Sequence, residues 1–306
     1  MSFKVVSPKT VDKLLQAIAE NQGRNFRFCA GGTDLLLEIK KNPVKGLTVI
    51  NLAQLDGEDF TSIDISADRI RIGALVTAHR IAGDDGLRQQ IPALCEAAIR
   101  HGSRQIRQVA TVGGNLCTAS PAGDMACALV ALEAKCEILS ARGTVRTIPI
   151  DQFFIDVRKT DLKRDEVLRG VTIPIDHAPK AYSGFVKVGT RRSMECAVVS
   201  LAYHFRMDDN DRVLHAGVAI GSVAPTIKFV TSARDYLIGK TLSPVNKTIE
   251  QSSSQTIGAI ECEAFARTVL EYASPISDIR GSAWYRSEVL FNISKSILQS
   301  ARSISI

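Results

Sequence analysis

Two short glycine-rich segments hold the residues of this 306-residue chain that are best suited to bind a ligand. The first is AGGTD at 30–34, and the second is TVGGN at 111–115, which runs on to an aspartate at 124. Glycine lets backbone N–H groups come close to a ligand, and successive N–H groups in a turn form a concavity that suits anions. The two segments therefore indicate either a nucleotide site or two tight turns without a ligand.

The common nucleotide-binding motifs are absent from the chain. No two glycines stand two positions apart, so the GxGxxG motif is missing, and GKT at 239–241 lacks the upstream glycine of a phosphate-binding loop. Asp34 would bring like charge to a phosphate. We expect it to cap the helix that follows or to face a ribose hydroxyl. A nucleotide site in this chain must follow another plan.

Composition excludes several other classes of protein. The seven cysteines and five histidines form no CxxC or HxxxH pair, which argues against a disulfide framework and against a metal site on this chain. The net charge of +6 is spread along the chain, which argues against a nucleic-acid partner. The start, MSFKVVSPKT, is not typical of a signal peptide, and no apolar stretch is long enough for a membrane span. We expect a cytoplasmic protein.

Hydrophobic periodicity predicts alternating helices and strands before residue 176 and strands followed by helices after it. Thr10 is the expected N-cap of the first helix, and Pro92 lies near the start of another. The polar, proline-bearing stretch at 176–182 is the candidate domain boundary. Helices are expected over 10–20, 34–40 and 86–102, strands over 26–30, 47–52, 68–77 and 166–174, and a hairpin over 134–150.

Longer segments around the two glycine pairs carry a resemblance to a known family. FCAGGTDLLLEIK and RQVATVGGNLCTASPAGDMACALVAL, followed in order by LRGVTIP, FVKVGTRRSMECAVVSLA, GVAIGSVAPT and DIRGSAWYRSEVL, resemble the FAD-binding (medium) subunit of molybdenum hydroxylases. That family includes the medium subunits of xanthine dehydrogenase and of aerobic carbon monoxide dehydrogenase. The resemblance covers nearly the whole chain.

The resemblance implies an α+β fold with two domains. Residues 1–176 would form a two-lobed FAD-binding domain of the vanillyl-alcohol-oxidase (PCMH) type, with lobes of about 1–55 and 56–176 and FAD extended between them. Residues 177–306 would form a smaller α+β domain of the carbon monoxide dehydrogenase flavoprotein type.

The resemblance also implies which residues would hold FAD. Residues 30–34 would cradle the pyrophosphate, and four residues from 111 to 118 would form the second FAD-binding segment. Asp124 would bind hydroxyl groups. Leu168 and Lys187 would lie beside the flavin ring. Gly123 stands where many relatives have Ser or Ala, so a hydroxyl contact is lost there. The residues are Ala30, Gly31, Gly32, Thr33, Asp34, Thr111, Gly114, Asn115, Thr118, Gly123, Asp124, Leu168 and Lys187.

Three of the expected roles have plain structural alternatives. Lys187 is the candidate for tuning the flavin, because a nearby cation stabilises the anionic reduced form; the alternative is a surface lysine on a strand. His101 would stack on or hydrogen-bond the ring, or is a packed residue at a helix end. Arg191 or Arg192 would gate the ring or shape the acceptor site, or both are solvated loop residues.

The resemblance implies an oxidoreductase in which cofactors perform the chemistry. A large subunit would carry molybdenum–pterin and a small subunit two [2Fe–2S] clusters, forming a heterotrimer, with no cluster on this chain. This chain would pass electrons through FAD to NAD⁺ or another acceptor. GGNLCTASPAGD and KVGTRRSMECA look closer to a xanthine-dehydrogenase-like complex than to the carbon monoxide branch, and the medium subunit of a carbon monoxide or aromatic-substrate dehydrogenase is an alternative. A self-contained FAD-dependent oxidase and a non-catalytic nucleotide-binding module are the alternatives.

Overall fold

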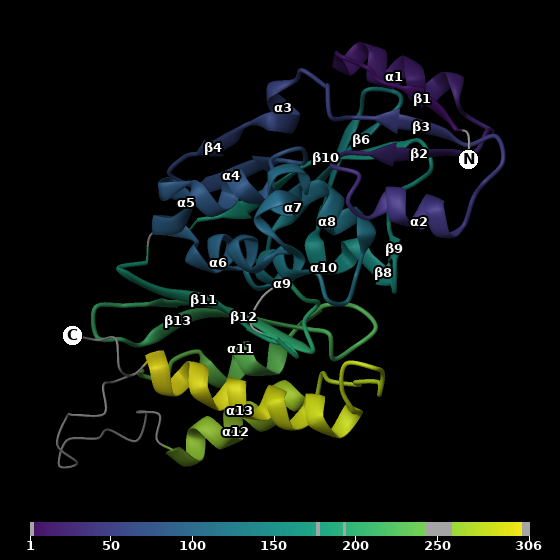
Figure 1. The fold of residues 1–306 in the computed structure, drawn as a ribbon. Helices are drawn as coiled ribbons and strands as arrows, with labels where there is room; N and C mark the ends of the chain where they lie inside the picture. The colour runs from purple at the N-terminus through teal and green to yellow at the C-terminus, as the bar shows by residue number, and fades with distance from the viewer. Residues whose placement is uncertain (1–2, 176–177, 192–193, 243–258, 302–306) are drawn as a thin grey trace.

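The computed structural model describes residues 3–175, 178–191, 194–242 and 259–301, which form three β-sheets and a two-stranded ribbon with covering helices (Figure 1). Within those residues, no helix is long and apolar enough to cross a membrane. The predicted domain boundary falls partly on residues 176–177, outside the described residues, and so stays a prediction.

The first sheet has three parallel strands in the order β1 (Lys4–Val6), β3 (Thr48–Asn51) and β2 (Phe26–Cys29). Parallel strands need crossover connections, and helices α1 (Val11–Glu20) and α2 (Leu35–Lys41) supply them. The Oγ1 atom of Thr10 accepts a hydrogen bond from the N–H of Lys13, so Thr10 caps α1 as expected. The alternation of strands and helices predicted for this region is confirmed.

The second sheet has five antiparallel strands, and β10 (Glu166–Pro174) is its centre. On one side β10 pairs with β5 (Arg69–Gly73) and on the other with β6 (Lys135–Ser140). The outer strands are β4 (Ile63–Ile65) and β7 (Val145–Pro149). The hairpin predicted over 134–150 is the β6–β7 pair.

A group of short helices lies between the second sheet and the last part of the chain (Figure 1). The single helix predicted over 86–102 is two helices. Ile91 has a non-helical backbone (φ −140°, ψ 61°), and Pro92 opens the second helix, where its missing N–H has no intrahelical partner to lose. The elements of this group, with the ribbon that follows β7, are α4 (Ala78–Gly83), α5 (Asp85–Gln90), α6 (Pro92–Arg100), α7 (Arg104–Val109), α8 (Val112–Thr118), α9 (Asp124–Ala131), α10 (Ile150–Phe153), β8 (Phe154–Asp156) and β9 (Lys159–Thr160). Helix α3 (Glu58–Thr61) is separate from this group and lies above β4 in Figure 1.

The third sheet is antiparallel and is covered by helices on both faces (Figure 1). Its strands are, in order, β11 (Lys180–Val188), β12 (Val199–Met207), β13 (Val213–Gly221) and β14 (Lys228–Phe229). Helices α11 (Thr231–Leu237), α12 (Ala259–Leu270) and α13 (Ala283–Ala301) cover one face, while α6 and α9 contact the other. The strands of this part of the chain precede its helices, as predicted from the sequence.

Helix α9 joins the third sheet to the rest of the molecule. All eight of its residues are buried, and one apolar core contains α9 together with Phe185, Ala202 and Ala219 of the third sheet. The backbone of β13 lies close to the end of α9 at Gly217, where an added Cβ would lie 1.9 Å from the carbonyl oxygen of Ala131. Only glycine allows β13 to approach the end of α9 this closely.

Arg146 links two carboxylates beside the second sheet, and this link makes stability depend on pH. Its guanidinium lies 2.7 Å from an oxygen of Glu166 and 2.7 Å from an oxygen of Asp161. The Glu166 side chain is only 5% exposed, and hydrogen bonds from Arg146 hold the pKa of Glu166 below its ordinary value. A carboxylate whose pKa is lowered by folding stabilises the fold above its unfolded pKa, and that stabilisation is lost as the pH falls through the folded value.

We therefore expect Glu166→Gln to lower the free energy of unfolding by about 1.5–3 kcal/mol at neutral pH. The difference from wild type should shrink as the pH falls below about 4.3, the ordinary pKa of glutamate in an unfolded chain, and should vanish below the lower pKa of the folded state. Urea unfolding over a pH series measures both effects, with Glu288→Gln on the exposed face of α13 as the control. A difference that is the same at every pH would contradict this expectation.

Candidate functional site

The first glycine segment (residues 30–34) forms the turn between β2 and α2. Gly32 has φ +71°, a conformation that side chains rarely adopt, and an added Cβ on Gly31 would lie 1.9 Å from the carbonyl oxygen of Val109. The backbone N–H groups of residues 31–34 donate to no acceptor within the described part of the chain. A row of free N–H groups in such a turn suits an anion.

The second glycine segment (residues 111–115) opens α8 and is held by its own hydrogen bonds. Thr111 is the N-cap, and its Oγ1 accepts a hydrogen bond from the N–H of Gly114 at 3.0 Å. The N–H of Asn115 donates to the carbonyl of Thr111 at 3.0 Å. This segment therefore shapes the site, whereas the free backbone donors lie in the first segment.

Asp34 connects the first glycine segment to the end of α8, the helix that the second segment opens. Thr118, the last residue of α8, donates from Oγ1 to Asp34 Oδ2 at 3.2 Å, and the guanidinium of Arg158 lies 3.3 Å from the same oxygen. Asp34 stands before α2, but its side chain makes no capping hydrogen bond, so the expected cap is wrong. Partners from distant parts of the chain hold the carboxylate instead.

The side chain of Asn115 accepts a capping hydrogen bond at the start of α9, which Gly123, the N-cap residue, has no side chain to accept. Gly123 is the N-cap of α9 and has no side chain to accept a hydrogen bond. The Oδ1 atom of Asn115 accepts instead from the N–H of Ala126 at 3.0 Å. A Cβ on Gly123 would lie 3.4 Å from that same Oδ1. The side-chain amide of Asn115, from α8, thus caps α9 in place of a hydroxyl at position 123.

Asp124 and Lys187 form a buried ion pair. Lys187 Nζ lies 2.8 Å from Asp124 Oδ2, and the two side chains are 7% and 5% exposed. Lys187 also donates to the carbonyl of Arg100 at 3.2 Å, so it is no surface lysine. Asp124 Oδ1 is buried and has no hydrogen-bond partner among the described residues, which leaves an acceptor of the kind that a ligand hydroxyl satisfies.

His101 ends α6 beside this pair. Its Nδ1 lies 3.7 Å from Asp124 Oδ2, which is too long for a strong hydrogen bond, and its side chain is 22% exposed. The structure thus brings His101 to Asp124 and Lys187.

Two expected site residues lie apart from these contacts. Leu168 is buried in β10 as part of the apolar core. Arg191 lies in an exposed loop after β11, where its N–H donates to Glu195 at 2.8 Å and its guanidinium to the carbonyl of Met194. Arg192, the other arginine considered for gating, lies outside the described residues. The roles of Leu168 and Arg191 stay predictions.

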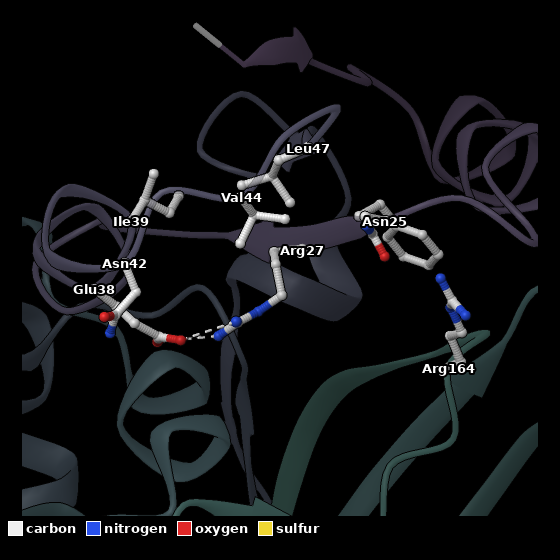
Figure 2. Close-up of a pocket in the computed structure, with 9 residues that line it drawn as sticks. Asn25, Arg27, Glu38, Ile39, Asn42, Val44, Leu47 and Arg164 are labelled. Atoms are coloured by element: carbon white, nitrogen blue, oxygen red, sulfur yellow. Dashed lines mark hydrogen bonds and ion pairs between the residues drawn. The ribbon is translucent and has the colours of Figure 1, made fainter. Parts of the chain in front are cut away.

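A surface cavity of about 350 Å³ lies beside β2 and α2 but contains none of the residues of the two glycine segments. Figure 2 shows Arg27 and Glu38 joined across it, at 3.0 and 3.1 Å, with Arg164 at the other end. The charged pair in this cavity is already satisfied, whereas the first glycine segment has free donors. We therefore place the candidate site at the glycine segments and Asp124.

The arrangement suits a ligand that carries both phosphate and hydroxyl groups. Free N–H groups at 31–34 suit the phosphate, and the unpartnered oxygen of Asp124 suits a hydroxyl. The hydrogen bond between Thr118 and Asp34 holds the first glycine segment against the end of α8, which the second segment opens. Among the described residues no group of three or more His, Cys, Asp or Glu side chains is arranged to hold a metal ion.

Comparison with protein-family models gives two matches. Residues 1–176 match the FAD binding domain in molybdopterin dehydrogenase, and residues 184–301 match the CO dehydrogenase flavoprotein C-terminal domain. Together these matches span most of the chain.

Curated relatives match over similar lengths. A xanthine dehydrogenase FAD-binding subunit of Escherichia coli O157:H7 is 28% identical over 95% of this chain and 93% of its own length. A nicotinate dehydrogenase FAD-subunit of Eubacterium barkeri is 31% identical over 79% of this chain and 81% of its own length.

Solved structures share the fold. Quinoline 2-oxidoreductase from Pseudomonas putida 86 superposes with a TM-score of 0.84 at 25% identity, covering 99% of this chain and 97% of that one. Carbon monoxide dehydrogenase from Oligotropha carboxidovorans superposes with a TM-score of 0.87 at 22% identity, covering 99% of this chain and 98% of that one. The α+β fold class, with an FAD-binding domain followed by a C-terminal flavoprotein domain, is confirmed.

Proposed function

We propose that this chain, which belongs to the family of FAD-binding subunits of molybdenum-containing dehydrogenases, passes electrons from the [2Fe–2S] clusters of a partner subunit to NAD⁺ or another acceptor. It is a subunit of an oxidoreductase, and its cofactor is FAD. We propose in addition that the partner's [2Fe–2S] clusters donate the electrons and that NAD⁺ or another acceptor receives them.

The row of free N–H groups at 31–34 is the observation that supports FAD binding, on which this proposal depends. A Cβ on Gly31 would collide with the backbone of Val109, so the turn can keep its shape only with glycine at that position. The residues present fit the cofactor: Ala30 to Asp34 would hold the pyrophosphate, and Asp124 would accept from a hydroxyl. Thr111, Gly114, Asn115 and Thr118 would fix the facing segment.

FAD, when bound, supplies the capacity to accept electrons singly and to release them as a pair. The chain itself needs no general acid or base for that task. Lys187 places a cation in the buried part of the site, but Asp124 lies 2.8 Å away and offsets its charge. We propose that this pair, with His101 beside it, sets the electrostatic environment of the flavin.

We propose a xanthine-dehydrogenase-like complex with NAD⁺ as the acceptor. Xanthine, nicotinate and nicotine, which appear in the names of relatives, are all nitrogen heterocycles. This favours such a substrate over carbon monoxide. The proposed partners are a small iron–sulfur subunit and a large molybdopterin subunit, in a cytoplasmic heterotrimer.

Co-purification and flavin reduction test this proposal. We expect the chain, expressed with the products of its neighbouring genes, to purify with two partners and with one FAD per chain. Xanthine should bleach the flavin absorbance in the complex but not in the isolated chain. A colourless chain that does not take up FAD would contradict the proposal, and bleaching in the isolated chain would favour a self-contained oxidase.

A further inference from the structure

Arg158 occupies a backbone conformation that glycine adopts more easily. It lies in the turn between β8 and β9 with φ +56°. Its N–H donates at 3.0 Å to the carbonyl of Ala119, which ends α8 with φ +46°. A left-handed conformation is less favourable for a residue with a Cβ than for glycine. An arginine here therefore suggests that its side chain has a function that glycine could not supply.

The side chain of Arg158 lies at the junction of the two glycine segments. One guanidinium nitrogen, Nη1, is 3.3 Å from Asp34 Oδ2, the oxygen that also accepts from Thr118. The other N–H groups of the guanidinium donate to no acceptor within the described residues, and the side chain is 57% exposed. Arg158 thus keeps free charged donors beside the turn whose backbone N–H groups are also free.

A cation beside Asp34 is needed if an anion is to bind at the first glycine segment. Its carboxylate follows directly on the free N–H groups of the first glycine segment and would repel an anion bound there. Arg158 offsets that charge. An exposed ion pair of this kind is weak, so the guanidinium can exchange Asp34 for a stronger anionic partner. Arginine binds phosphate oxygens through two parallel hydrogen bonds, which suits a diphosphate.

We propose that Arg158 binds the diphosphate of the dinucleotide held at the first glycine segment, with Asp34 and Thr118 positioning it. The inference rests on the proposed function, in which that dinucleotide is FAD. Sequence reasoning assigned no role to Arg158, which lies 124 residues from Asp34.

Titration of FAD into the deflavinated full-length chain tests this proposal, with quenching of flavin fluorescence as the measure of binding. We expect Arg158→Gly to raise the Kd for FAD about tenfold or more, because a charged hydrogen bond is lost. The loss should shrink as ionic strength rises. Arg158→Lys should keep part of the affinity. The melting temperature of deflavinated Arg158→Gly should equal or exceed that of wild type, because glycine relieves the left-handed backbone.

The adjacent Lys159 provides the matched control. Lys159→Gln removes one exposed positive charge from the same ribbon and should change the Kd little. An unchanged Kd in Arg158→Gly, or an equal loss in Lys159→Gln, would overturn the proposal. A wild-type chain that does not bind FAD at all would instead contradict the proposed function, so the two failures are distinguishable.

Discussion

Replacing Lys187 with methionine is expected to lower the free energy of unfolding by about 3–5 kcal/mol, because it removes one partner of a buried ion pair. Asp124 is 5% exposed, and one of its oxygens already has no hydrogen-bond partner among the described residues. Without the ammonium group, the carboxylate is left with His101 Nδ1, at 3.7 Å, as its ion-pair partner among the described residues. Urea unfolding of the wild type and the variant measures the loss.

The double variant Lys187→Met/Asp124→Asn separates the ion pair from simple packing. It removes both charges, so most of the stability should return. A double variant as unstable as the single one would mean that the loss came from the shape of the lysine side chain rather than from the unpaired carboxylate.

The same variants report on the proposed tuning of the flavin. Lys187→Met changes the local charge from neutral to negative, which should lower the midpoint potential of bound FAD by disfavouring the anionic reduced form. The double variant is again neutral, so its potential should lie close to that of wild type. Spectroelectrochemical titration measures both, and an unchanged potential in the single variant would remove the tuning role.

Gly31→Val should yield a chain that folds less stably and purifies without FAD. The new Cβ would lie 1.9 Å from the carbonyl oxygen of Val109, a backbone atom that cannot rotate away. Either the turn or the end of α7 must move, at a cost of about 1–3 kcal/mol or more, and the free N–H groups at 31–34 lose their alignment. The flavin-to-protein ratio after purification measures the result.

Gly83→Ala is the matched control for Gly31→Val. Gly83 ends α4, has no neighbouring atom within 4 Å of an added Cβ, and has no positive φ. This variant should keep both its FAD and its stability. Full FAD occupancy in Gly31→Val would show that the first glycine segment does not hold the cofactor.

Local signals in the sequence were enough to predict much of the fold. The cap at Thr10 and the turn of the β6–β7 hairpin depend on neighbours within a few residues, and both are present. Pro92 was expected near a helix start, yet the break at Ile91 that divides the predicted helix was not foreseen. Ile91 carries no breaker signal of its own, because its conformation is set by the proline that follows.

Contacts across long stretches of chain explain what the sequence could not predict about the site. Asp34 was expected to cap α2, but Thr118 and Arg158 hold its carboxylate from 84 and 124 residues away. The pairing of Lys187 with Asp124, 63 residues apart, likewise follows from the packing of the third sheet against α9. The glycine pairs were visible in the sequence because a turn that presents backbone N–H groups needs them locally.

The burial of α9 against the third sheet has a consequence for synthesis of the chain. The ribosome produces α9 well before β11, β12 and β13, and N-terminal segments fold first as they emerge. Until those strands arrive, one side of α9 is uncovered and Asp124, its first residue, has no lysine partner. The proposed flavin site is therefore completed late in translation, and a ribosome-bound chain that ends near residue 176 should be a substrate for chaperones rather than a ready acceptor of FAD.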